Sequence, residues 1–325
     1  MTGSALGSEL GSALAGAYRT SHPRLFALVE RARLLPSLTT AVVFPHDCAS
    51  LRAAIDATQV GLINPVFYGS EMRMRAISEQ ANLSLSAVMI DTGNCPADAA
   101  RVAVADAGAG HVQALMKGSL HTDELLAPVV ARASPLRGSG RVTHTFVFDL
   151  PRYHKLLAMT DAVINIAPDV RAKADAITNA LQLLSALGVD APKVAIIAAV
   201  ETVNTQIPAT MDAAALVALA RKGHFGASMI EGPLGFDNAF SAAAALAKGI
   251  VSTVAGDPDL LVVPDLNSGN LLYKSFVYVG GGECAGLVQG ARVPIILTSR
   301  TDSQFSRVAS CALASIAGFA ATEHR

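Results

Sequence analysis

Polar residues that suit phosphate binding and proton transfer follow an apolar run near the end of the chain. Residues 293–297 are apolar, and Thr298-Ser299-Arg300-Thr301-Asp302 come directly after them. A guanidinium can hold a phosphate through two N–H groups, a hydroxyl can orient a thiol, and a carboxylate can act as a base. A helix cap beside an exposed arginine would need the same residue types. From the residues alone, the segment is compatible with either role.

A second stretch, Met116-Lys117-Gly118-Ser119-Leu120-His121-Thr122, follows another short apolar run and precedes a helix expected to begin near Asp123. Free backbone N–H groups at a helix start, with a lysine beside them, suit a phosphate. An ordinary capped loop with a surface lysine would have the same composition, and a single histidine such as His121 is more often structural than catalytic.

Two further loops have more glycine and polar residues than a strand-to-helix connection requires. One spans residues 231–239 and contains Asp237; the other spans 264–270 and contains Asn267, Gly269 and Asn270. Glycine lets the backbone approach a ligand closely, and small polar residues at a helix start form an anion cradle. In both loops a plain helix cap is the alternative.

Short apolar segments alternate with helical patterns along the chain, which predicts an α/β fold with mainly parallel strands. Ligands bind such sheets at the carboxyl ends of the strands, where all four loops are placed. Strands are expected at 40–44, 66–68, 87–90, 114–116, 142–149, 162–166, 194–200, 260–264 and 293–297. Helices are expected at 25–34, 50–59, 71–81, 97–107, 169–187, 212–221, 238–250, 270–278 and 303–321.

Two connecting regions separate these elements. The segment 135–141 is rich in turn formers and predicts a domain boundary, and the first 20 residues or so are expected to be loosely ordered.

The composition narrows the classes of function. The 325 residues are 51% hydrophobic and 16% charged, with a net charge of −1, so nucleic acid and anionic membranes are not expected partners. Mean hydropathy is +0.41, but the apolar runs are too short to span a bilayer, and the start does not resemble a signal peptide. The four cysteines are scattered, which argues against a metal site or disulfides and favours a cytoplasmic setting.

Taken in order, several segments from about residue 40 onward resemble the phosphate acetyltransferase and phosphate butyryltransferase (phosphotransacylase) family. They read VFPHD at 43–47, GLINP at 61–65, MKG at 116–118, NIAP at 165–168, DNA at 237–239, PDLNSGN at 264–270 and LTSR at 297–300. The ending LTSRTDS is most similar to the phosphate butyryltransferase branch, and the set also resembles the transferase half of proteins fused to a hydratase.

The resemblance implies two three-layer α/β domains of the isocitrate and isopropylmalate dehydrogenase type. The first would comprise residues 1–140 and 291–325, the second 141–290, with the active site in the cleft between them. The family commonly forms homodimers or higher homo-oligomers, uses coenzyme A as a substrate and needs no tightly bound cofactor. The implied reaction is direct attack of the coenzyme A thiolate on an acyl phosphate.

The resemblance also assigns roles to residues. Ser299 would hydrogen-bond the thiol and Arg300 would stabilise the developing negative charge. The family places an aspartate where Ser306 stands and a phosphate-binding arginine where Ala127 stands, so Asp302 is our expected base and Lys117 our expected phosphate ligand. The other expected substrate-binding residues are Gly118, Ser119, His121, Thr122, Asp237, Asn267, Gly269 and Asn270.

Two other functions fit the same scaffold, since a fold does not fix an activity. One is a coenzyme A-binding protein without turnover, suggested by Ser306 and Ala127. The other is a metal- and NAD-dependent hydroxyacid dehydrogenase, which would need clustered aspartates and a dinucleotide loop that the sequence lacks.

Overall fold

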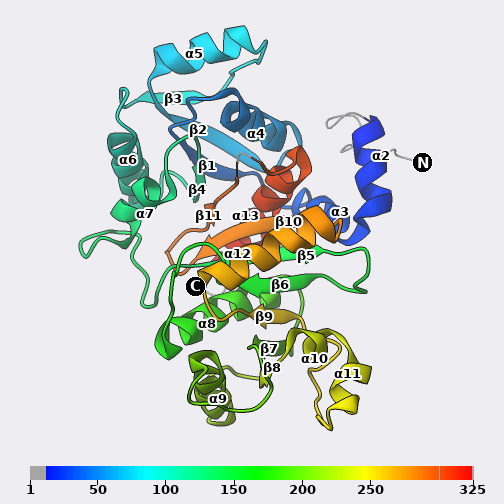
Figure 1. The fold of residues 1–325 in the computed structure, drawn as a ribbon. Helices are drawn as coiled ribbons and strands as arrows, with labels where there is room; N and C mark the ends of the chain where they lie inside the picture. The colour runs from blue at the N-terminus through cyan, green and yellow to red at the C-terminus, as the bar shows by residue number, and fades with distance from the viewer. Residues whose placement is uncertain (1–11, 300, 324–325) are drawn as a thin grey trace. The chain divides into compact units, whose positions relative to one another are not determined.

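The computed structural model describes residues 12–299 and 301–323. Its contacts divide the chain into two compact units. Unit 1 combines the residues up to Ser139 with those from Cys284 onward, and unit 2 is Gly140–Glu283. Figure 1 colours the chain from blue to red, so that the two parts of unit 1 carry colours from opposite ends of the scale.

Unit 1 contains strands in the order β3-β2-β1-β4-β11-β10. The first five pair in parallel, and β10 is antiparallel to β11. Their bounds are β1 Leu38–Val43, β2 Ile63–Gly69, β3 Val88–Asp91, β4 Ala114–Lys117, β10 Glu283–Gln289 and β11 Ile295–Ile296. Because the five strands are parallel, their carboxyl ends lie at one edge of the sheet.

Two helices of unit 1, α4 and α5, begin at residues whose side chains cap them. Asp47 caps α4 by accepting the Ser50 amide at 2.7 Å, and Ser70 caps α5. The bounds are α2 Ser12–Ser21, α3 Pro23–Ala32, α4 Cys48–Gln59, α5 Glu71–Gln80, α6 Pro96–Ala109, α7 Thr122–Val130 and α13 Gln304–Glu323. The expectation of a loosely ordered start is therefore wrong from residue 12 onward, while residues 1–11 lie outside the described part.

Unit 2 contains strands in the order β5-β6-β9-β7-β8, with β5 antiparallel to β6 and the other neighbours parallel. The bounds are β5 Thr143–Asp149, β6 Leu157–Thr160, β7 Lys193–Ile197, β8 Met229–Leu234 and β9 Leu260–Val262. The Gly-Pro pair predicts a loop at residues 231–234, but these residues belong to β8. Pro233 is tolerated there because β8 is the last strand in this order, where a missing N–H is least costly.

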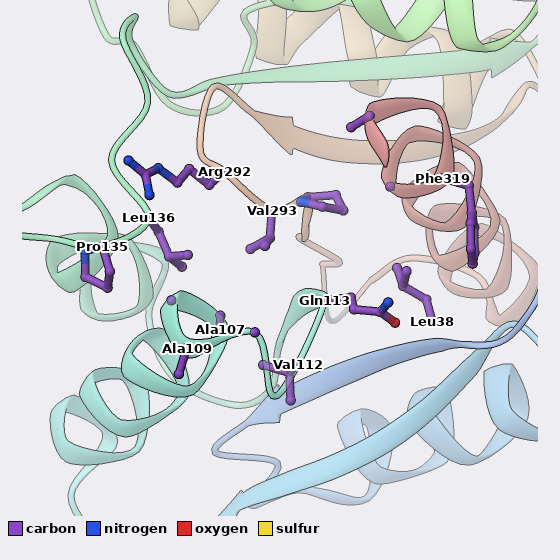
Figure 2. Close-up of a pocket in the computed structure, with 15 residues that line it drawn as sticks. Leu38, Ala107, Ala109, Val112, Gln113, Pro135, Leu136, Arg292, Val293 and Phe319 are labelled. Atoms are coloured by element: carbon purple, nitrogen blue, oxygen red, sulfur yellow. The ribbon is translucent and has the colours of Figure 1, made fainter. Parts of the chain in front are cut away.

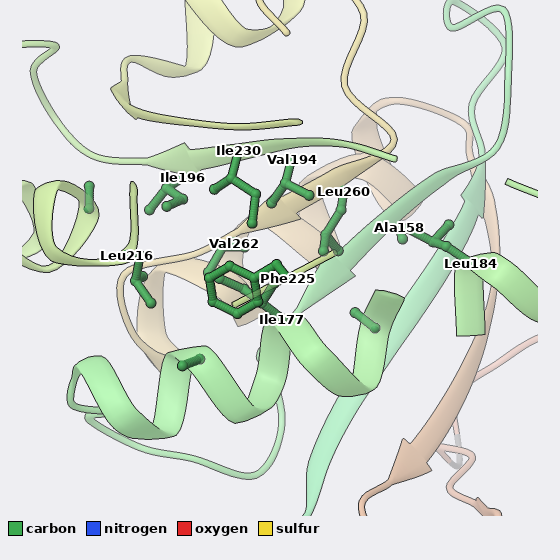
Figure 3. Packing of buried hydrophobic residues seen from close by; sticks show 13 residues of the cluster. Ala158, Ile177, Leu184, Val194, Ile196, Leu216, Phe225, Ile230, Leu260 and Val262 are labelled. Carbon is green, nitrogen blue, oxygen red and sulfur yellow. The ribbon is translucent and has the colours of Figure 1, made fainter. Parts of the chain in front are cut away.

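The core of unit 2 lies between its sheet and the long helix α8, Val170–Ala186 (Figure 3). Ile177 and Leu184 of this helix pack with Val194, Leu260 and Val262 of the strands, and all five are at least 97% buried. Each such side chain contributes roughly 1.5–3 kcal/mol of hydrophobic stabilisation. The other helices are α9 Pro208–Arg221, α10 Phe236–Phe240, α11 Ala242–Ala247, α12 Leu266–Lys274 and a π-helical turn, η1, at Ser275–Val279.

One predicted strand is wrong. Residues 162–166 form no strand, because the Asp161 carboxylate accepts the amides of Val163, Ile164 and Asn165 at 3.0–3.2 Å. These side-chain bonds replace the bonds that a neighbouring strand would make. The strand of this region is β6, four residues long and fully buried, immediately before Asp161.

One predicted helix is also divided. The expected helix 238–250 is instead α10 and α11, which meet at Ser241. Ser241 has extended backbone angles and caps α11 by accepting the Ala244 amide at 3.1 Å. The predicted α/β class with mainly parallel strands is nevertheless confirmed. Among the described residues, none of the helices has both the length and the apolar character needed to cross a bilayer.

Candidate functional site

Two of the predicted loops leave neighbouring strands of unit 1. Met116 of β4 pairs with Ile296 of β11, and Lys117 pairs with Val43 of β1. Because these strands are parallel, the segments after Val43, Lys117 and Ile296 emerge side by side at the carboxyl edge. This edge is where open α/β sheets bind their ligands.

The loop after β11 forms a tight turn around Ser299. The Ser299 amide donates to Asp302 Oδ2 at 2.6 Å, and the Asp302 amide donates to the Ser299 carbonyl at 3.2 Å. The exposed Ser299 hydroxyl lies 3.0 Å from the Thr301 hydroxyl. The Asp302 carboxylate is thereby held against the backbone of Ser299. Arg300, the third candidate catalytic residue, lies outside the described residues.

The loop after β4 is tied to the turn after β1. Gly118 donates its amide to the Val43 carbonyl at 2.9 Å, and a Cβ on Gly118 would lie 2.4 Å from that oxygen. The Ser119 hydroxyl donates to the Phe44 carbonyl at 2.8 Å and accepts the His46 amide at 2.9 Å. Both residues therefore have a structural function that is sufficient to explain their types.

Lys117 and His121 bond within their own loop. The Lys117 ammonium donates to the carbonyls of Gly118 and Leu120 at 3.2 and 3.1 Å. His121 is the N-cap of α7 and donates its amide to Glu124 Oε2 at 2.7 Å. Thr122 is the first residue of α7. The loop thus presents a cation and a helix N-terminus at the carboxyl edge of unit 1.

The remaining predicted residues lie in unit 2, at the carboxyl ends of its parallel strands. Asp237 follows β8, is exposed, and pairs with Lys248 at 3.1 Å, which lowers the pKa of the carboxyl. Both asparagines lie in α12, where Asn267 is exposed and Asn270 is half-buried. Gly269 is buried, and a Cβ there would lie 2.9 Å from that of Ala162, so close helix packing accounts for this glycine.

A hollow of about 520 Å³ in unit 1, which the sequence does not predict, is lined by Phe44, His46, Asp47, Ala49, Arg73 and Ser119. His46 is 94% buried, and its Nε2 accepts the Ser70 amide at 3.0 Å. Burial, and next the charge of Arg73, lower the pKa of His46. His46 lies in the VFPHD segment, but its role could not be predicted from sequence because Ser70 and Ser119, its partners, lie 24 and 73 positions away.

Two polar residues of the core lie near the start of α13. The Ser306 hydroxyl is buried and donates to the Cys284 carbonyl at 2.6 Å. Asp56 of α4 accepts from the Gln304 amide group at 2.9 Å, and burial raises the pKa of Asp56. The Ser306 hydrogen bond thus joins α13 to β10. A hydroxyl at this position cannot act as the carboxylate base expected from the family resemblance.

Figure 2 shows another hollow of unit 1, of about 320 Å³. Leu38, Gln113 and Val293 line it, and each lies at or just before the amino end of its strand. The hollow therefore lies at the edge opposite to the two candidate loops, and it contains none of the predicted site residues. Within the described part of the chain, no three His, Cys, Asp or Glu side chains are grouped closely enough to hold a metal ion.

Comparison with known proteins adds independent information. A family model described as phosphate acetyl/butaryl transferase matches residues 94–315. The chain is 46% identical to a phosphate acetyltransferase of Rhizobium meliloti, over 89% of this chain and 92% of that protein. It is 35% identical to a phosphate butyryltransferase of Clostridium beijerinckii, over 89% of this chain and 96% of that protein.

The structure of a branched-chain phosphotransacylase from Enterococcus faecalis V583 superposes with a TM-score of 0.73 at 26% identity. It covers 86% of this chain and 99% of that chain. The family model spans more than half of the sequence, and the relatives match over most of their own length. Both findings confirm the family resemblance inferred from the loop motifs, but the relative of higher identity is an acetyltransferase and not a member of the butyryltransferase branch that the ending LTSRTDS indicated. The chain therefore belongs to the phosphate acetyl/butaryl transferase family.

Proposed function

We propose that this protein transfers an acyl group reversibly between coenzyme A and inorganic phosphate. The observation that carries the proposal is the parallel pairing of β4 with β11, because it sets the Ser299 turn beside the Lys117 loop. The Ser299 turn supplies a hydroxyl that can orient a thiol and a carboxylate that can act as a base. The Lys117 loop supplies a cation that can bind phosphate. An acetyl group is favoured, since the acetyltransferase relative is 46% identical and the butyryltransferase relative 35%.

In the proposed reaction the coenzyme A sulfur attacks the carbonyl carbon of an acyl phosphate. A C–S bond forms, the C–O bond to phosphate breaks, and the phosphate leaves with the electron pair. The thiol proton passes to Asp302 and then to the departing phosphate, so no proton is gained or lost overall. We assign Ser299 to orient the thiol and Arg300 to stabilise the charge on the reacting oxygen.

We further assign substrate contacts to Lys117, His121, Thr122, Asp237, Asn267 and Asn270. Three further residues support these contacts indirectly. Gly118 and Gly269 allow neighbouring backbone segments to pack closely, and Ser119 fixes its loop by a hydrogen bond to Phe44. Coenzyme A is a substrate here and not a resident cofactor. A homodimer is the proposed assembly, by analogy with the family.

The direct test is release of free thiol by the purified protein with phosphate and acetyl-, propionyl- or butyryl-CoA. We expect phosphate-dependent release, fastest with acetyl-CoA. Ser299→Ala should lower kcat about a hundredfold, the typical loss for one group that acts in the transition state. Ser275→Ala is a matched control, because Ser275 is exposed and its hydroxyl donates only locally, to the Leu271 carbonyl one turn earlier in α12.

Two outcomes would change the assignment. Absence of release with all three thioesters, while coenzyme A still raises the melting temperature, would support the binding protein without turnover. A change of NAD absorbance with a hydroxyacid and a divalent metal would support the dehydrogenase, which the comparisons do not favour.

A further inference from the structure

The hollow beside His46 differs from the loops already assigned, since only Ser119 is common to both. It lies where β1, β2 and β4 end, because Phe44 follows β1, Ser119 follows β4, and Arg73 is in the first turn of α5 after β2. Asp47 and Ala49 place the N-terminus of the twelve-residue α4 at the same hollow. Helix N-termini carry partial positive charge and amides without partners within the helix.

His46 supplies the second observation. Its Nε2 accepts the Ser70 amide, so that nitrogen carries no proton, and the neutral ring must be protonated on Nδ1. Nδ1 is buried and has no hydrogen-bond partner among the described residues. A buried N–H group without an acceptor is rare in native proteins, and a bound anion is one physical explanation for such a group.

Arg73 adds a full charge. Its side chain is exposed, and none of the ion pairs within the described part of the chain includes it. Asp47 also lines the hollow, with its Oδ1 committed to the Ser50 amide. A carboxylate beside these donors repels a fully deprotonated anion, but it can accept a hydrogen bond from a phosphate that still carries a proton.

We propose that this hollow is a phosphate subsite in which Arg73, the His46 Nδ1–H group and the start of α4 donate to the phosphate oxygens and Asp47 accepts a hydrogen bond from the remaining P–OH group. The inference rests on the proposed function for the identity of the ligand, which is either the substrate phosphate or the 3′-phosphate of coenzyme A. It assigns to Arg73 the guanidinium contribution that Ala127 cannot supply.

The test compares Arg73→Met with Arg75→Met. Arg75 lies on the same helix and is also exposed, but it pairs with Glu71 at 2.7 Å and does not line the hollow. Binding of inorganic phosphate, sulfate, coenzyme A and dephospho-coenzyme A is measured by calorimetry, and Michaelis constants by thiol release. Loss of one charge-assisted contact corresponds to about a tenfold weaker binding.

The expected result is about tenfold weaker binding in Arg73→Met, no change in Arg75→Met, and wild-type preference for phosphate over sulfate. If only phosphate binding weakens, the subsite holds the substrate phosphate; if coenzyme A weakens and dephospho-coenzyme A does not, it holds the 3′-phosphate. Unchanged binding of every probe in Arg73→Met, or an equal loss in both variants, would overturn the subsite. Absence of thiol release by the wild-type protein would instead refute the proposed function, and the calorimetry would still decide the subsite.

Discussion

At the scale of single residues, the junction between β1 and β4 depends on three neighbours. Phe44 has a φ of +56°, a left-handed conformation that costs a residue with a side chain about 1–2 kcal/mol. Gly118 and Ser119 stabilise it with hydrogen bonds to the carbonyls of Val43 and Phe44. The position of the Lys117 loop therefore depends on Gly118. This glycine is required because its backbone lies against that of Val43 and Phe44, and not because of a positive φ.

Gly118→Ala should destabilise the protein by roughly 1–3 kcal/mol, as typical for overpacking. The added Cβ would meet backbone oxygens at 2.4 and 2.6 Å, which cannot rotate away as a side chain could. Chemical unfolding measures the loss. Gly16→Ala is the control, since nothing lies within 4 Å of a Cβ there, and a comparable loss in that variant would refute the steric explanation.

Asp302→Asn tests the proposed base. An asparagine oxygen can still accept the Ser299 amide, which Asp302 now accepts at 2.6 Å, so the turn should persist while the charge is lost. We expect a fall in kcat of about 10²–10⁴ and loss of the acidic limb of the pH–rate profile. An unchanged rate with an unchanged profile would remove Asp302 from the mechanism.

His144 predicts a loss of stability at acidic pH. Complete burial on β5 lowers the pKa of His144 from 6.5 to about 3. Between these values the unfolded chain binds a proton that the folded protein does not, so the free energy of unfolding falls as the pH falls below 6.5. The loss should reach about 2 kcal/mol at pH 5.

Urea unfolding at pH 7.5 and pH 5 measures this difference, and His144→Gln should reduce it by about the same amount. His111→Gln removes an imidazole whose side chain is 70% exposed, and should leave the difference unchanged. If the two variants responded alike, His144 would not be the titrating group.

At the scale of elements, α8 and α9 are joined by an ion pair as well as by apolar contacts. Lys173 Nζ lies 2.6 Å from Asp212 Oδ2, with side-chain exposures of 6% and 24%. Removing one partner of a buried pair leaves a charge without compensation, whereas replacing both with apolar groups is often neutral.

Lys173→Met should therefore cost about 3 kcal/mol of unfolding free energy, because the Asp212 carboxylate would remain at the helix interface. The double variant Lys173→Met/Asp212→Leu should recover most of that loss. Equal losses in the single and double variants, measured by urea unfolding, would show that the lysine stem and not the ion pair stabilises the interface.

The elements predicted from sequence were those with long, regular patterns. Helices at Cys48–Gln59, Val170–Ala186 and Gln304–Glu323 agree with the predictions to within two residues, because their caps and apolar spacing are local signals. Three strands were not predicted, each for its own reason. β6 has only four residues, β8 contains Gly-Pro, and β10 follows three consecutive glycines.

The candidate site could be predicted only in part. The Ser299 turn and the Lys117 loop are contiguous in sequence, so their residue types were visible. The hollow joins three segments that only the strand order brings together, and no local pattern indicates that Ser70 donates to His46. Tertiary contacts of this kind carry no signal in one sequence.

At the scale of the whole molecule, unit 2 is one continuous stretch of chain and unit 1 is two. The second part of unit 1 supplies β11, which pairs with β4, and α13, which packs against α3 and α4. Phe305, Val308, Leu313 and Ile316 of α13 are at least 97% buried.

Deleting residues 303–325 should therefore unfold unit 1 and leave unit 2 structured. Limited proteolysis should cut the truncated chain within residues 12–139 and spare a fragment close to Gly140–Glu283. Protection of both units after the deletion would show that α13 is dispensable for the core of unit 1.

The interrupted path of unit 1 also has a consequence during synthesis. The ribosome completes every strand of unit 2 before it reaches β11 and α13, and at about 5–20 residues per second the wait after β4 lasts roughly 10–35 seconds. Throughout that interval β4 lacks β11, one of its two neighbouring strands, and the apolar faces of α3 and α4 lack their covering helix. During this time the nascent chain exposes apolar surface of the kind that chaperones bind, and completion of α13 covers it.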